Sequence, residues 1–222
     1  MNNITLQIIA RIAALPVIVW LILLLPAGTF DFWEVYVYFG LLLVMMVLAL
    51  VYFVKHDPGV LKRRLETREK ESTQKVVITL MGLAIIAVYL LSGFDRRFEW
   101  SATPLWIQVI GFLLVVGGYL FATLVMKQNS FAARTVRVEE SQQLVDTGLY
   151  GVVRHPMYTG VVAMYAGTPI ALGSWYGLAP LLIFIICLQV RMQNEEQVLT
   201  NELEGYSDYK QRVHWRLIPG IW

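Results

Sequence analysis

The sequence predicts an all-α integral membrane protein with about six transmembrane helices. Of its 222 residues, 57% are hydrophobic and only 15% are charged, whereas a soluble domain is about 45–50% apolar and about 25% charged. Its apolar stretches approach the roughly 20 residues that a helix needs to cross a bilayer. Polar segments rich in lysine and arginine alternate with polar segments that are poor in both. Composition and segment length together exclude an ordinary soluble domain.

The apolar stretches give the expected positions of the spans. They cover residues 4–25, 35–54, 76–91, 105–126, 157–172 and 175–190. The last two have 16 residues each and are joined through Gly173-Ser174, which predicts a tight helical hairpin. Both arms are short for a span. We therefore expect the second arm to continue past Arg191 towards Leu203.

The distribution of basic residues predicts the orientation in the membrane, because cytoplasmic loops carry an excess of lysine and arginine. The basic segments are 55–75, 127–155 and the tail from 191. The alternate loops, 26–34 and 92–104, hold only Arg96 and Arg97. Six spans with both termini in the cytoplasm satisfy this bias throughout.

The first basic segment, 55–75, mixes seven basic with four acidic residues. At helical spacing such a mixture is typical of a solvated, salt-bridged connector, which can also contact anionic lipid headgroups. We predict no catalytic residue there. The only cysteine, Cys187, lies in an apolar run, so one chain can form neither a disulfide framework nor a cysteine metal site. No metal site is predicted.

The polar stretch 147–160 is the first candidate for chemistry. Proline suits the first turn of a helix, so Pro156 should begin one, with Arg154 and His155 just ahead of its N-terminus. Free N–H groups and the positive end of the helix dipole there suit a carboxylate or phosphate. The plainer alternative is that a basic residue before a membrane helix only marks the cytoplasmic side.

A second polar cluster, Arg191 to Glu196, ends the last apolar stretch. Arg191 and Glu195 are four residues apart and therefore share a helix face, where they could form a simple surface ion pair. Alternatively each could bind a ligand, because arginine grips a carboxylate through two parallel hydrogen bonds and a glutamate can bind an ammonium group or sugar hydroxyls. Both clusters end adjacent hairpin arms, so we expect them to be close in space.

An ordered set of motifs follows these clusters through the C-terminal half. It reads Gly148-Leu149-Tyr150, Arg154-His155-Pro156-Met157-Tyr158-Thr159-Gly160, Arg191-x-x-x-Glu195-Glu196, Gly205-Tyr206-x-x-Tyr209-x-x-x-Val213 and Arg216-Leu217-Ile218-Pro219. This set resembles the isoprenylcysteine carboxyl methyltransferase family, and the related phospholipid methyltransferases share much of it. The resemblance covers roughly residues 130–222. It divides the chain into an N-terminal four-helix membrane region, 1–127, and a catalytic region, 128–222.

The resemblance implies a membrane methyltransferase that uses S-adenosyl-L-methionine in a cytoplasmic-face pocket closed by the C-terminal segment. The cofactor contacts it implies are Gln142, Gln143, Leu144, Val145, Tyr150, His155, Pro156, Met157, Tyr158 and Glu195. It also implies that Arg191 orients the carboxylate of the acceptor. A carboxylate attacks an activated methyl group without a base. An amine acceptor would benefit from one, and Glu196 is a weak candidate.

Three functions stay open at this level. The first is methylation of a carboxylate on a lipophilic, isoprenylcysteine-like acceptor; the second retains the cofactor and methylates a phospholipid amine or a small thiol. The third is a non-enzymatic scaffold or transporter subunit. Transporters usually have polar residues or glycine breaks in mid-span, whereas Gly82 and Gly117-Gly118 are more simply explained by close helix packing. We expect membrane lipids as partners and no nucleic acid.

Overall fold

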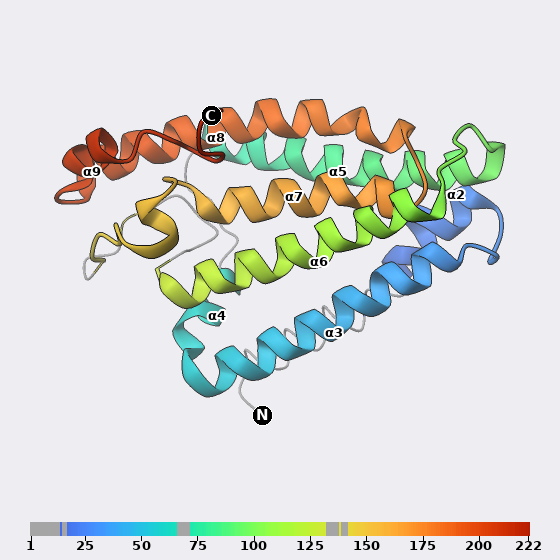
Figure 1. Cartoon of the computed structure of the whole chain (residues 1–222), viewed down its shortest axis with the longest axis horizontal. Helices are drawn as coiled ribbons and strands as arrows, with labels where there is room; N and C mark the ends of the chain where they lie inside the picture. Colours follow the sequence, from blue (N-terminus) through green and yellow to red (C-terminus); the bar gives the residue numbers. More distant parts are fainter. Residues whose placement is uncertain (1–13, 15–16, 66–71, 132–137, 139–141) are drawn as a thin grey trace.

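The chain forms a bundle of long helices that lie side by side along the longest axis of the molecule (Figure 1). The computed structural model describes residues 14, 17–65, 72–131, 138 and 142–222, and every regular element among them is helical. The long helices are α3 (Trp33–His56), α5 (Ser72–Phe98), α6 (Leu105–Gln128), α7 (Pro156–Ala171) and α8 (Pro180–Glu202). These bounds confirm the all-α class.

Short helices precede, connect and follow the long ones. They are η1 (Trp20–Leu24), α2 (Leu25–Ala27), α4 (Pro58–Leu65), η2 (Gly148–Gly151), η3 (Tyr176–Leu178) and α9 (Tyr206–Arg212). The run from η1 into α2 ends at Gly28, which has a φ of 67°. A residue in this left-handed conformation ends many helices, and glycine adopts it without strain.

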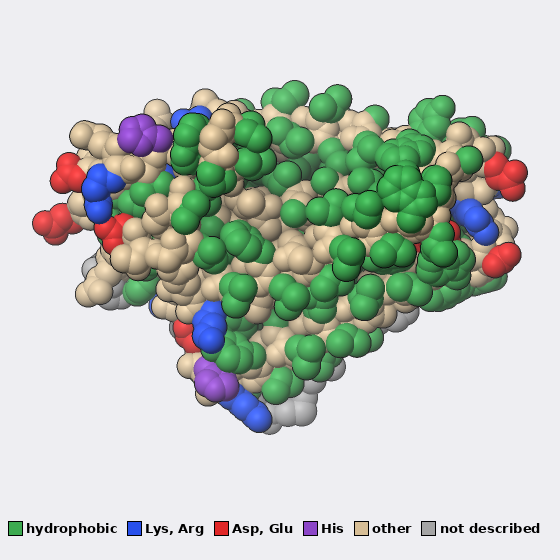
Figure 2. All heavy atoms as spheres, in the orientation of Figure 1, with side chains coloured by type: hydrophobic (Ala, Val, Ile, Leu, Met, Phe, Trp, Pro, Cys, Tyr) green, Lys and Arg blue, Asp and Glu red, His purple; other side chains and the backbone are tan. Residues whose placement is uncertain are grey.

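Four helices are long and apolar enough to cross a membrane: Trp33–His56, Thr73–Phe98, Leu105–Gln128 and Tyr176–Glu202. Helix α7 has 16 residues, and a shorter apolar helix covers Val17–Ala27. Most of the expected first span lies outside the described residues, so the number six stays a prediction. Figure 2 shows hydrophobic side chains over the middle of the bundle and charged ones gathered towards its ends.

The arms of the expected hairpin pack against other helices more than against each other. Helix α7 packs mainly on α6, and α8 packs mainly on α5. Glycines explain the first pairing: a Cβ added to Gly118 would lie 2.5 Å from the Gly160 carbonyl oxygen, and one added to Gly167 would lie 2.7 Å from that of Gly111. Small residues let backbones approach in this way. The expectation of close packing is confirmed for Gly118, whereas a Cβ on Gly117 or Gly82 would meet no atom of the described residues within 4 Å.

A hydrogen-bonded group inside the bundle joins α3, α5 and α7. The Tyr38 hydroxyl lies 2.9 Å from Thr168 Oγ1 and 3.0 Å from the Tyr89 hydroxyl. Buried hydroxyls need partners to offset their lost hydration, and these three satisfy one another. Such a group fixes the rotation of the three helices and therefore the direction in which their ends present side chains.

Helix α8 continues beyond its apolar part, as the sequence predicts, and ends at Glu202. Its last turns present Arg191, Glu195 and Glu196 next to the beginning of α7. The two polar clusters are therefore neighbours in space, as expected from their positions at the ends of consecutive helices.

Candidate functional site

A cavity of about 300 Å³ lies between the start of α7, the last turns of α8 and the segment around η2. Ligand pockets range from about 300 to 1,000 Å³, so it is large enough to be considered as a binding site. Helices α4 and α5 also contribute residues to its wall, and so does the C-terminal tail that follows α8, residues 203–222. The cavity thus draws on both the 1–127 region and the 128–222 region.

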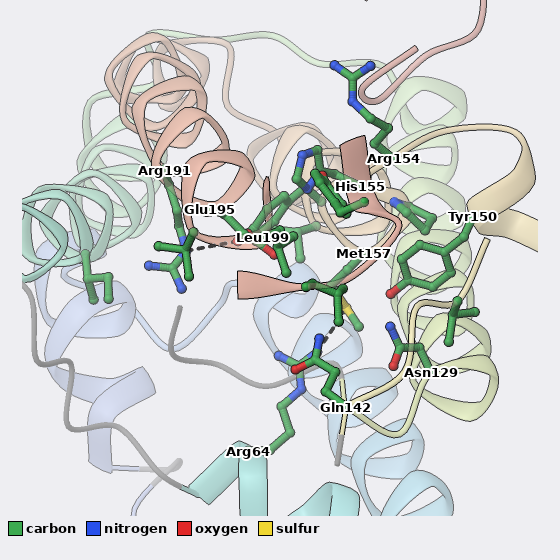
Figure 3. Close-up of a pocket in the computed structure, with 18 of the residues that line it drawn as sticks. Arg64, Asn129, Gln142, Tyr150, Arg154, His155, Met157, Arg191, Glu195 and Leu199 are labelled. Carbon is green, nitrogen blue, oxygen red and sulfur yellow. Dashed lines mark hydrogen bonds between the residues drawn. The ribbon is translucent and has the colours of Figure 1, made fainter. Parts of the chain in front are cut away.

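All ten expected cofactor contacts line this cavity, and so does Arg191. They are Gln142, Gln143, Leu144, Val145, Tyr150, His155, Pro156, Met157, Tyr158 and Glu195. Figure 3 shows Arg191 and Glu195 on one side of it and Arg64, Asn129 and Tyr150 on the other. Glu196 is absent from the lining. The structure therefore brings together residues that are far apart in the sequence, with that one exception.

The N-terminus of α7 forms as its proline predicts. Pro156 is its first residue and His155 is its N-cap. The backbone N–H groups of Arg154 and His155 donate to the carbonyls of Trp215 and Arg216, each at 2.9 Å. The C-terminal tail therefore occupies the backbone donor of the N-cap residue and that of the residue before it.

Glu196 is the centre of a buried ionic network. Its carboxylate accepts hydrogen bonds from Arg154 Nε at 2.8 Å, His155 Nε2 at 3.1 Å and the Arg216 guanidinium at 3.2–3.3 Å. Lys210 Nζ lies 3.6 Å from it, and the Glu196 side chain is only 3% exposed. A carboxylate bound by this many donors is a poor general base. The weak base role for Glu196 is thus replaced by a structural one, which ties the tail to α7.

Tyr158 connects Arg191 to Glu195. Its hydroxyl donates to Glu195 Oε2 at 2.7 Å and accepts from Arg191 Nε at 3.0 Å. A second guanidinium nitrogen of Arg191 donates to Gln74 Oε1 at 2.9 Å, and Gln74 is fully buried. Arg191 is therefore a buried positive charge in a fixed orientation, not a mobile side chain at a helix end.

Two residues of the site come from the segment in which we predicted no chemistry. Arg64 of α4 lines the cavity and donates to the Met157 sulfur at 3.1 Å. Gln74 of α5 positions Arg191. Seven basic residues crowd this segment, and no pattern in the sequence distinguishes Arg64 from its neighbours.

Three tyrosines from the loop and the tail cover the polar side of the cavity. Burial raises the pKa of Tyr150 to about 12, and its hydrogen bond with Asn129 offsets part of that rise. Burial also raises the pKa of Tyr206 and of Tyr209 well above the usual range of a phenol. All three are therefore neutral near pH 7 and act as hydrogen-bonding groups.

The tail closes over the site through specific contacts. The Tyr209 hydroxyl donates to the Tyr150 carbonyl at 2.8 Å, and Thr159 Oγ1 donates to the Leu217 carbonyl at 2.8 Å. Tyr206 also lines the cavity, and its hydroxyl is buried without a hydrogen-bond partner in the described structure.

The rest of the cavity wall is apolar and runs along the helices. Its lining includes Ile78, Met81 and Ile85 of α5, Val161 and Tyr165 of α7, and Phe184 of α8. All of these lie within the helices that form the apolar bundle. One cavity therefore has a charged end and an apolar end that extends into the membrane-length helices.

Comparison with known proteins agrees with this description. Residues 106–205 match the family model of phospholipid methyltransferases. The mouse protein Delta(14)-sterol reductase TM7SF2 is 28% identical over 127 residues, which are 51% of this chain and 30% of the relative. The nickel-cobalt-cadmium resistance protein NccN of Alcaligenes xylosoxydans xylosoxydans is 26% identical over 152 residues, which are 66% of this chain and 63% of that protein.

The matched family segment runs from the start of α6 to just before α9, so it contains both polar clusters. This segment is therefore the part of the chain that is similar to phospholipid methyltransferases. The alignments span about a third and just under two thirds of the two relatives.

Proposed function

We propose that this protein is an S-adenosylmethionine-dependent methyltransferase that acts on a lipophilic acceptor. One observation carries the proposal: the residues expected to contact the cofactor, from two segments of the chain, surround one cavity with a charged and an apolar end. The match to the phospholipid methyltransferase family supports the same class of reaction. A cavity that joins polar and membrane-embedded walls suits a polar cofactor and an acceptor that arrives from the bilayer.

The residues present suit the chemical groups of this cofactor. Glu195 offers a carboxylate to an ammonium group, and the guanidinium of Arg64 offers a positive charge to a carboxylate. The rings of Tyr150 and Tyr158 can face a sulfonium, because cations are attracted to aromatic faces.

When bound, this cofactor would supply a methyl group already activated by its positively charged sulfur. The protein then has to orient the acceptor and exclude water. Orientation can lower a barrier by up to roughly 7–11 kcal/mol in ideal intramolecular cases. Arg191, fixed by Tyr158 and Gln74, would direct a carboxylate acceptor. The tyrosines of the tail would separate the site from water.

We propose a carboxylate as the first candidate acceptor, because the guanidinium of Arg191 is held in a fixed orientation at the cavity. A phospholipid amine is the second candidate. The family match favours the amine. An amine must lose a proton, and Glu195 lies at the cavity with its Oε2 bound to Tyr158. Glu196 is not proposed for that role, because its carboxylate is bound by Arg154, His155 and Arg216.

The test uses the purified full chain in detergent with cofactor labelled in its methyl group. It is incubated with membrane lipid extract and with lipophilic carboxylic acids, and the labelled products are separated. A base-labile methyl ester indicates a carboxylate acceptor, and a base-stable product in the lipid fraction indicates an amine. No transfer to any extract, together with oxidation of a nicotinamide cofactor by a sterol, would replace the methyltransferase with a reductase.

A further inference from the structure

The apolar end of the candidate cavity follows one face of α5. Ile78, Gly82 and Ile85 lie on that face at spacings of four and three residues, and all three line the cavity. Residues at such spacings are neighbours on a helix surface, and the stretch from Ile78 to Ile85 covers about 10 Å of helix. Val161 of α7 and Phe184 of α8 also line this end, and both helices pack beside α5 (Figure 1). The apolar end therefore extends for about two turns along the bundle.

Gly82 differs from the glycines at which helices of this bundle touch. A Cβ added to Gly118 or Gly160 would lie less than 3 Å from the backbone of the facing helix, whereas a Cβ added to Gly82 would meet no atom of the described residues within 4 Å. A glycine inside a helix lowers the stability of that helix relative to most other residues, and no close helix contact at position 82 accounts for it. The missing side chain instead leaves space beside the cavity that Gly82 lines.

The charged end of the cavity lies in line with this face of α5. Gln74, two turns before Gly82 on α5, accepts a hydrogen bond from Arg191 at 2.9 Å. Helix α8 packs along α5 in the opposite direction, because η3, which precedes α8, also packs on α5. Two turns away from Arg191, α8 therefore presents Phe184 to the cavity at about the depth where α5 presents Gly82. A head group bound by Arg191 would direct an attached chain towards Gly82.

We propose that Gly82 is a specificity-determining residue, which leaves room in the apolar end of the cavity for one hydrocarbon chain of the methyl acceptor. This inference rests on the proposed function, because it assigns the head group of that acceptor to Arg191. The rings of Tyr165 and Phe184, with centroids 5.2 Å apart, belong to the same wall. A chain at this place would bury its surface against apolar side chains of three helices, which is favourable in proportion to the area buried. A small thiol would gain nothing from these contacts.

The test measures binding of a chain without methyl transfer. The full chain is reconstituted into phosphatidylcholine nanodiscs and photolabelled with a diazirine derivative of hexadecanoic acid. We expect saturable labelling of the parent protein, and hexadecanoic acid should compete at least about tenfold better than octanoic acid, because it buries more methylene groups. Gly82→Leu should weaken the saturable labelling by at least about tenfold, since displacing even two methylene groups from an apolar wall costs that much. Gly82→Ala, which adds a single methyl group, should have an intermediate effect.

Gly117→Leu is the matched control. A Cβ on Gly117 would also meet no atom of the described residues within 4 Å, but this glycine lies on α6, outside the lining of the cavity. It should be labelled like the parent, and thermal unfolding checks that each variant is folded. The inference is overturned if Gly82→Leu, or Gly82→Ala where the leucine variant does not fold, is labelled like Gly117→Leu.

Calorimetry with S-adenosylmethionine on the same preparations separates this inference from the proposed function. A parent protein that binds S-adenosylmethionine but shows no saturable labelling would overturn the inference and leave the proposed function in place. A parent protein that is labelled but does not bind S-adenosylmethionine would overturn the proposed function, and with it the assignment of the chain to a methyl acceptor.

Discussion

Two buried carboxylates at opposite ends of the bundle, those of Glu196 and Glu34, have opposite surroundings. At the end with the candidate site, Glu196 is surrounded by Arg154, His155 and Arg216. At the other end, Glu34 is buried, and its Oε2 atom has no hydrogen-bond partner among the residues that the structure describes. A carboxylate that is neutralised by basic side chains from several segments holds those segments together.

The same distinction separates two adjacent residues of α8. Glu196 faces the tail and is 2% exposed, whereas Glu195 faces the cavity and accepts a hydrogen bond from Tyr158 at 2.7 Å. Consecutive residues of a helix point in directions about 100° apart, since a turn contains 3.6 residues. A shift of one position along α8 therefore separates the carboxylate with a structural role, Glu196, from the carboxylate that faces the cavity, Glu195.

The largest effect should follow from Glu196→Gln. Removing one partner of a buried ionic network leaves the other charges uncompensated, which costs about 3–5 kcal/mol. We therefore expect the free energy of unfolding to fall by that amount and the tail to lose its contact with α7. Denaturant titration in mixed micelles measures the stability, with Glu202→Gln as the exposed control. A loss below about 1 kcal/mol, which is typical of a surface ion pair, would contradict the structural role of Glu196 in binding the tail to α7.

Glu195→Gln should have a smaller effect of a different kind. It conserves the shape of the side chain and removes the charge that we assign to the ammonium group of the cofactor. We expect cofactor affinity to fall by about tenfold, which corresponds to roughly 1.4 kcal/mol, with stability nearly unchanged. Calorimetric titration of the variant measures the affinity. Unchanged affinity would assign Glu195 to the acceptor or to the protein itself.

Arg191→Lys conserves the charge and loses the planar fork that bonds Tyr158 and Gln74. We expect cofactor affinity to change by less than about twofold, while single-turnover methyl transfer to a carboxylate acceptor falls by about tenfold, or 1.4 kcal/mol. Tyr158→Phe is the companion variant, because it removes the hydrogen bond between the Tyr158 hydroxyl and Arg191 Nε and leaves the guanidinium in place. If Arg191→Lys instead weakened the cofactor as much as Glu195→Gln, Arg191 would serve the cofactor.

The last prediction in this series changes neither stability nor binding and tests the two ends directly. Single cysteines at Arg97 and at Glu204, both exposed, are introduced into a Cys187→Ala background. The distribution of lysine and arginine predicts that they react with a membrane-impermeant reagent from opposite sides, with position 204 on the cytoplasmic side. Labelling of both from one side would contradict the proposed orientation of the cavity.

The sequence was sufficient to predict the helices that lie in the membrane-length stretches and the start of α7 at Pro156, because apolar length and proline geometry are local properties. It also predicted that the clusters at 154–158 and 191–195 would be neighbours, which follows from their positions at the ends of consecutive helices. It did not predict that α7 would pack on α6. That pairing depends on where Gly118 and Gly160 meet in space, which no local pattern records.

The roles of Glu196, Arg64 and Gln74 were missed for a related reason. In the sequence Glu195-Glu196 is simply an acidic pair, and only the rotation of α8 separates the two carboxylates. Arg64 belongs to a segment whose charges are typical of a solvated connector, yet its position places it at the cavity. Gln74 is fully buried although it precedes the apolar stretch. Tertiary packing, not residue type, gives each of them its contact.

The most direct test of the account is calorimetric titration of the purified, folded protein with S-adenosylmethionine and with its demethylated product. The account predicts binding of both with a Kd in the micromolar range, on the order of −8 kcal/mol. It also predicts weaker binding to Glu195→Gln and little change for Glu202→Gln. No heat and no thermal shift with either ligand, on protein shown to be folded, would contradict the claim that the cavity between α7 and α8 is a methyltransferase site.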